Sequence, residues 1–182
     1  MPSKTAAEAV ERYRSSIQRI LSCVTRDVIS LQGAPGRSPY DPGDVQHVIE
    51  LGGPGVVRLT GAEQLSLRVL FRYQIGSTGE QGRGWDVTTR AYYYAVRDAD
   101  RGEVVAYHWH PEGSGSVTDP HLHVGRAIVG PALQFGNRYI HRMHFPTGEV
   151  SLAAIIRLLV EEFGVRPLRD DWREVLREIG DQ

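Results

Sequence analysis

Residue types and segments that mark secreted or membrane proteins are scarce in this 182-residue chain. It has one cysteine, Cys23, which excludes an internal disulfide and is typical of a reducing compartment. The first residues contain no apolar segment of the kind found in secretory signals. No apolar run approaches the roughly 20 residues that a bilayer-spanning helix requires. These absences predict a cytoplasmic protein with no membrane partner.

The chain also lacks an excess of either charge. It has 21 basic and 22 acidic residues, a formal net charge of −1, and Lys4 is its one lysine. This balance excludes a protein whose whole surface attracts nucleic acid, so any anion site must be local. With 41% apolar residues the chain can bury one core, and its length predicts one domain over residues 1–182.

The spacing of apolar residues predicts an α+β fold. The segment Thr5–Leu31 opens with a capping-box pattern and repeats apolar residues at helical spacing, which predicts a long N-terminal helix within residues 1–32. Residues 45–145 change to a period of two, as expected for an antiparallel sheet meander. Residues 151–180 return to helical spacing in two segments, which predicts two C-terminal helices.

Six of the seven histidines lie between positions 108 and 144, and four of them form the H-x-H steps His108–His110 and His121–His123. Residues two apart on a strand point to the same side, so each step places both imidazoles on one face. The turn-forming residues 111–120 let the chain double back. Placing His110 opposite His121 and His108 opposite His123 brings all four rings into one patch.

The strands expected before this loop add neighbours to the patch. Pairing Val96 with Val104 across residues 98–102 places Tyr92 opposite His108 and Arg90 opposite His110. The histidines at 141 and 144 are an odd number of positions apart, so a regular strand brings at most one of them to the patch. His47 precedes most of the sheet and is expected at the surface.

The leading hypothesis from these residues is metal-free acid–base catalysis on RNA, with no cofactor. Two histidines can divide the proton transfers while an arginine stabilises the phosphorane-like charge. The segment from His121 to Gly148 supports an anion site, because it contains arginines and histidines but no acidic residue. The predicted catalytic residues are His108, His110, His121, His123 and Tyr92, and the predicted substrate-binding residues are Arg90, Arg126, Arg142 and His144.

Two alternatives use the same patch differently. The four histidines of the H-x-H steps can act as ligands of zinc or another divalent metal in a metal-dependent hydrolase. The nearby acids, Glu112 and Asp119, lie in the loop, and their positions do not identify a general base. In the third alternative the protein is not catalytic, and the histidine face binds a partner.

Two short segments resemble a known family. Val105-Ala106-Tyr107-His108-Trp109 and Asp119-Pro120-His121-Leu122-His123-Val124-Gly125 resemble the TumE-like toxins of bacterial toxin–antitoxin modules, which have a Y-x-W strand and then a histidine cluster ending in H-V-G. The resemblance covers about a quarter of the chain. A glycine/serine loop replaces the arginine, aspartate, asparagine and proline run of that family. The resemblance implies a small cytoplasmic ribonuclease toxin with a cognate DNA-binding antitoxin.

Overall fold

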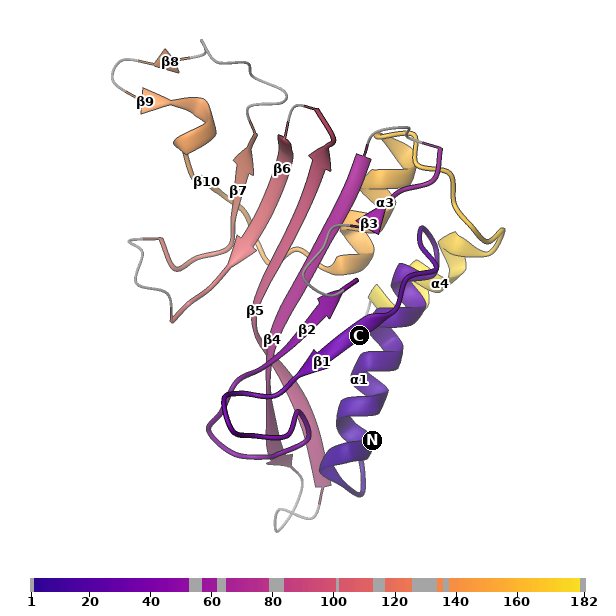
Figure 1. The fold of residues 1–182 in the computed structure, drawn as a ribbon, viewed down its shortest axis with the longest axis vertical. Helices are drawn as coiled ribbons and strands as arrows, with labels where there is room; N and C mark the ends of the chain where they lie inside the picture. The colour runs from indigo at the N-terminus through magenta and orange to yellow at the C-terminus, as the bar shows by residue number, and fades with distance from the viewer. Residues whose placement is uncertain are drawn as a thin grey trace.

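A computed structural model describes residues 2–52, 57–61, 65–78, 84–100, 102–112, 117–125, 134–135 and 138–180. The elements, in chain order, are α1 (Ala6–Leu21), β1 (Ile29–Gln32), β2 (His47–Leu51), β3 (Val57–Arg58), β4 (Leu65–Thr78), β5 (Gly84–Asp98), β6 (Gly102–Trp109), β7 (His121–Val124), β8 (Gln134–Phe135), β9 (Arg138–Tyr139), the 3-10 helix η2 (Ile140–Arg142), β10 (Phe145–Pro146), α3 (Leu152–Glu161) and α4 (Trp172–Gly180). Within these residues an antiparallel sheet follows one α-helix and precedes two others (Figure 1), which confirms the predicted α+β fold.

The main sheet has the strand order β1-β2-β4-β5-β6-β7-β10, with β3 also paired to β4. Its strand pairs are antiparallel, and from β4 to β7 each strand pairs with the next one in the chain, as in a meander. The two longest strands, β4 and β5, have 14 and 15 residues and lie next to each other in the middle of the sheet. Strands β8 and β9 form a separate pair beyond the end of β7 (Figure 1).

Helix α1 begins as predicted but ends ten residues earlier than predicted. At its start the backbone N–H of Glu8 donates to Thr5 Oγ1 over 3.1 Å. After Leu21 the chain turns, and Gln18 fixes the exit: its amide donates to the carbonyl of Asp27 and accepts from the N–H of Ile29. The predicted helix beyond this point is therefore wrong, because residues 29–32 pair with β2 instead. Cys23 is buried just after the helix, not inside it.

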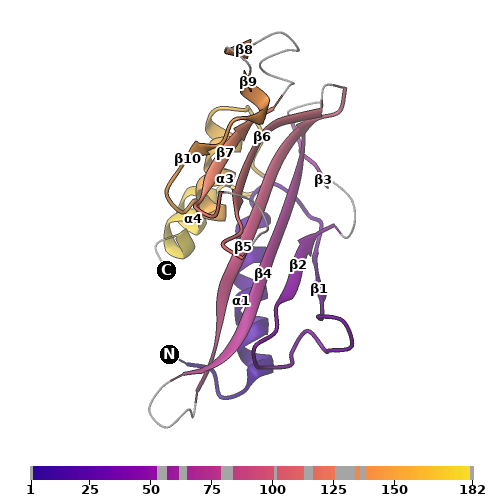
Figure 2. The same cartoon turned by 90° about the vertical axis from the view of Figure 1, so that its left-hand side faces the viewer.

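The apolar face of the sheet packs on the helices. The alternation predicted for β4 is confirmed, because five of its residues are buried on one face: Leu67, Val69, Phe71, Tyr73 and Ile75. The ring of Tyr13 on α1 contacts those of Phe71 and Tyr73, with centroids 6.2 and 5.9 Å apart. Helices α3 and α4 add buried apolar residues to the same core, and the three helices gather on one side of the sheet (Figure 2). The histidines of β6 and β7 lie on the opposite face of the sheet.

The β5–β6 register differs by one residue from the predicted register. Val96 lies opposite Val105, and Val104 is an extra residue between the Val96 and Arg97 pairs, a β-bulge. As a result Tyr92 lies opposite Trp109 on the helix-covered face, and the predicted pairs of Tyr92 with His108 and Arg90 with His110 are wrong. Tyr93 is the residue opposite His108.

Two further predictions about the sheet need correction. The sheet begins at β1, upstream of the predicted start at residue 45, and near the end of the predicted range 45–145 the 3-10 helix η2 separates β9 from β10. His47, expected at the surface, is fully buried in β2. The N–H of Ala34 donates to its Nδ1 and its Nε2 donates to the carbonyl of Asp41, so the ring is neutral and structural. In the part of the chain described here, no helix combines the length and apolarity needed to cross a bilayer.

Candidate functional site

The two H-x-H steps converge on the face of the sheet opposite the helices. His108 on β6 lies directly opposite His121 on β7, and His123 lies opposite Ala106. The predicted pairing of His110 with His121 was therefore wrong by two positions. A shift of two residues keeps every side chain on its face, so the predicted convergence is confirmed even though the register differs.

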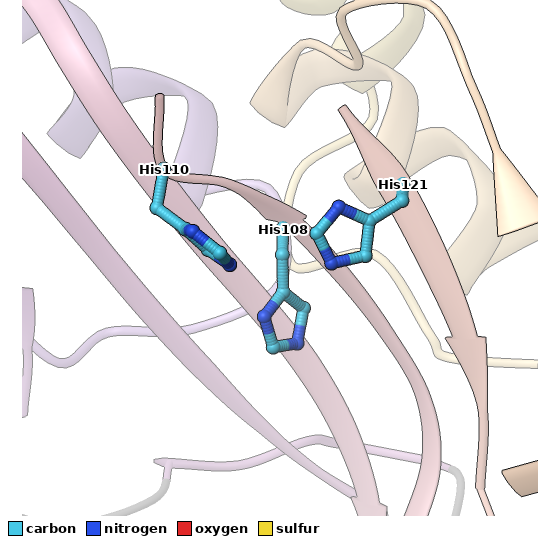
Figure 3. A group of neighbouring side chains, drawn as sticks. All are labelled: His108, His110 and His121. Carbon is cyan, nitrogen blue, oxygen red and sulfur yellow. The ribbon is translucent and has the colours of Figure 1, made fainter. Parts of the chain in front are cut away.

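Three imidazoles from this pair form the first group, His108, His110 and His121 (Figure 3). The ring centroid of His108 lies 6.1 Å from that of His110 and 5.4 Å from that of His121, and His110 and His121 are also 5.4 Å apart. The three rings turn toward one another from the end of β6 and the start of β7 (Figure 3).

A second group shares His121 and adds His123 and His144. The ring of His144 is 4.9 Å from that of His121 and 4.5 Å from that of His123. His144 reaches the cluster because β10, which follows it directly, pairs with β7. His141 lies instead on η2 against the ring of Tyr139, 5.4 Å away, so only one of this histidine pair joins, as predicted.

The spacing of the nitrogen atoms suits a metal ion after a small closure. In each group the nearest ring nitrogens all lie within 4.8 Å of one another. Ligands of a tetrahedral zinc ion, at about 2.0–2.1 Å from the metal, are about 3.4 Å apart. His110 and His144 lie just outside the strand ladder, so side-chain rotation at these two positions can supply the remaining movement.

His121 is the most constrained member of the cluster. Its side chain is 2% exposed, and its Nδ1 donates a hydrogen bond to the backbone carbonyl of Asp119 over 2.8 Å. A carbonyl oxygen only accepts, so Nδ1 carries a proton, and Nε2 is the ring nitrogen left for binding a metal. A backbone carbonyl in this position is the usual means of orienting a metal-binding histidine.

Burial keeps much of the cluster uncharged. Burial and then the neighbouring histidines lower the pKa of His108 to about 3, and the same causes lower the pKa of His123 to about 4. The pKa of His144 is also lowered, first by burial. Nε2 of His108 is buried and makes no hydrogen bond within the described residues. At neutral pH these rings therefore offer lone pairs, not positive charge.

Tyr93 joins the histidine face, a position that the predicted register gave to Tyr92. The Tyr93 ring packs edge-on against His108 with centroids 4.6 Å apart, and its hydroxyl donates to Glu103 over 3.2 Å. The guanidinium of Arg68 lies 5.6 Å above this ring and pairs with the buried Glu50 at 3.3 Å. Tyr93 was missed because the bulge that places it opposite His108 leaves no pattern in the sequence.

A groove of about 600 Å³ opens beside His108 and His110. Its lining includes the exposed residues Arg72 and Arg90, and Glu112, two residues after His110, also lines it. Arg90 is oriented by Gln74, whose Oε1 accepts from Arg90 Nε over 2.7 Å. In the same way, the amide of Gln46 donates to Glu112 over 2.6 Å. An anion in this groove would lie between arginines and imidazoles.

The other predicted site residues lie farther from this groove or outside the described residues. Tyr92 borders the groove, but its side chain lies on the helix side of the sheet, where its hydroxyl accepts from the N–H of Val150. Arg142 is exposed, with its guanidinium 5.7 Å above the ring of Tyr139. Arg126 lies outside the described residues.

Comparisons of the chain with protein-family models, with curated proteins and with solved structures found no match. The resemblance to the TumE-like toxins therefore depends on the quoted residues alone.

Proposed function

We propose that the histidine cluster is a transition-metal centre, zinc being the first candidate, and that the protein is a metal-dependent hydrolase of phosphodiesters. The observation that carries this proposal is the group His108, His110 and His121, in which a backbone carbonyl orients the shared ligand. Three histidine nitrogens are a ligand set typical of catalytic zinc, which keeps a further position for water.

The low pKa values of His108 and His123 favour a metal over proton shuttling by these two rings. A general acid must hold a proton near the working pH, whereas the pKa values of His108 and His123 lie near 3 and 4. Neutral imidazoles are the form that binds a metal. Nitrogen ligands select zinc, copper, nickel or cobalt over magnesium or calcium, which prefer oxygen.

The groove supplies the other groups that a hydrolysis requires, a proton acceptor and side chains that stabilise negative charge. A metal held by these histidines would supply an activated water for attack on phosphorus. Glu112 would accept the proton of that water and return it to the leaving oxygen as the bond from phosphorus to that oxygen breaks. Arg72 and Arg90 stabilise the negative charge on the phosphoryl oxygens.

The resemblance to TumE-like toxins supports RNA as the phosphodiester and a cognate antitoxin as the partner. We also place the protein in the cytoplasm, a proposal supported by its single cysteine, which is a buried free thiol.

The metal-free ribonuclease is the second candidate. It is supported by His110, which shares the groove with Arg72 and Arg90. The two candidates differ in what they require. The metal-free reaction uses the 2′-hydroxyl of RNA as nucleophile, while a metal-bound hydroxide needs no such group.

The test uses protein purified without a histidine tag and measures bound metal by mass spectrometry. Cleavage of labelled RNA is compared with that of bis(p-nitrophenyl) phosphate, which has no 2′-hydroxyl. We expect cleavage of both, loss with a chelator and recovery with zinc. His110→Ala should abolish cleavage and His141→Ala should not. Cleavage of RNA alone that resists the chelator would establish the metal-free ribonuclease. Bound metal without cleavage of either substrate would refute the hydrolase and favour the non-catalytic interaction protein.

A further inference from the structure

We infer that the cluster holds a single transition-metal ion that moves between two positions, one in each histidine group, with His121 as a ligand in both. This inference rests on the proposed metal centre and deepens it. It concerns the number of ions that bind and the position at which an ion first enters the cluster from solution.

The inference depends on the single lone pair that His121 can offer to a metal. Both groups of ligands contain His121, and neither contains a carboxylate or a thiolate. The hydrogen bond to the carbonyl of Asp119, at 2.8 Å, places the proton of the ring on Nδ1. Nε2 is then the one ring atom with a free lone pair, and a lone pair binds one ion. Three-histidine coordination in both groups at once is therefore excluded.

A bridging imidazolate does not remove this restriction. Bridging requires Nδ1 to lose its proton and to bind a second metal. The Nδ1 lone pair would then face the carbonyl lone pairs of Asp119 at 2.8 Å, a repulsive contact, and a metal has no room between the two atoms.

The two positions differ in their surroundings. The group with His108 and His110 adjoins the groove that contains Arg72 and Arg90, so an ion held there can reach a substrate. The group with His123 and His144 lies toward solvent, because His144 is exposed. We therefore assign the groove position to the working ion and the outer position to loading from solution.

Cobalt(II) or zinc(II) added alone to metal-free protein tests the inference. Native mass spectrometry should show one tightly bound ion per chain. His110→Ala and His144→Ala should each lower the affinity by about tenfold or less, because the ion keeps the other position. The fold-loss of affinity in the double variant should be far larger than the product of the two single fold-losses. His121→Ala should match the double variant, and His141→Ala is the control. The visible spectrum of bound cobalt should differ between the two single variants, because each leaves the ion in a different position.

The outcomes separate the two proposals. Two tightly bound ions per chain, or complete loss of binding in either single variant, would overturn the two-position inference and leave the metal centre intact. Failure of the unmodified protein to bind either ion would overturn the metal centre itself.

Discussion

His108 and His121 lie opposite each other across the β6–β7 pair, with their rings stacked 5.4 Å apart at an angle of 28°. Two rings in this arrangement cannot both be positively charged without strong repulsion, and Nε2 of His108 is buried without a hydrogen bond in the described structure. A shared metal ion satisfies both lone pairs at once. The predictions below follow from this relationship and from the groove beside it.

Zinc should stabilise the folded protein through His121, which belongs to both histidine groups. An ion that binds only the folded state adds about 2.7 kcal/mol to the free energy of unfolding at 100 times its dissociation constant. Thermal melts with and without zinc should show this increase in the wild type and in His141→Ala. His121→Ala removes the ligand common to both groups and should show little of it, and an equal zinc response in all three proteins would contradict the assignment.

The metal-free protein should lose stability as pH falls below about 6.5. The pKa values of His108 and His123, about 3 and about 4, lie below the ordinary value of 6.5, so the unfolded chain binds more protons across this interval. The free energy of unfolding is then highest above pH 6.5 and falls toward pH 4. Urea unfolding in chelator at about pH 7.5 and about pH 5 measures this loss. The double variant His108→Gln, His123→Gln should lose less stability, and an unchanged loss would assign it to other groups.

His47 should matter for stability and not for metal binding. Replacing it with alanine leaves the N–H of Ala34 and the carbonyl of Asp41 without their partner and opens a cavity beside Tyr73, whose ring centroid is 5.4 Å away. We expect a loss of about 2–4 kcal/mol in the free energy of unfolding. The zinc-dependent rise in melting temperature should persist, and its disappearance would mean that His47 supports the cluster.

The sequence predicts the faces of this sheet better than its register. The H-x-H steps share a face under any even shift, so an error of two residues in pairing His110 with His121 did not matter. The bulge at Val104 is a shift of one residue, which exchanges Tyr92 for Tyr93 beside His108. No periodicity reveals one extra residue near a turn.

Other differences depend on partners distant in sequence. Val24, Val28 and Leu31 continue the helical spacing of α1, yet residues 29–32 pair with β2 because tertiary pairing outweighs local propensity. The burial of His47 depends on a backbone amide and a carbonyl from residues 34 and 41, and only the folded loop brings these groups to the ring.

Arg72 and Arg90 should bind the phosphates of a single-stranded RNA in the groove. Each phosphate contact contributes about 0.7 to the slope of log affinity against log salt, so Arg72→Ala and Arg90→Ala should each weaken binding and reduce that slope by about this amount. Arg142→Ala is expected to weaken binding as well, because Arg142, the last residue of η2, comes two residues before His144 in the chain. The control is Arg157→Ala, an exposed arginine on α3. Titrations of labelled RNA at several salt concentrations measure these slopes. An equal loss in Arg157→Ala would indicate binding over the whole surface, and unchanged affinity in Arg72→Ala and Arg90→Ala would remove the groove as the anion site.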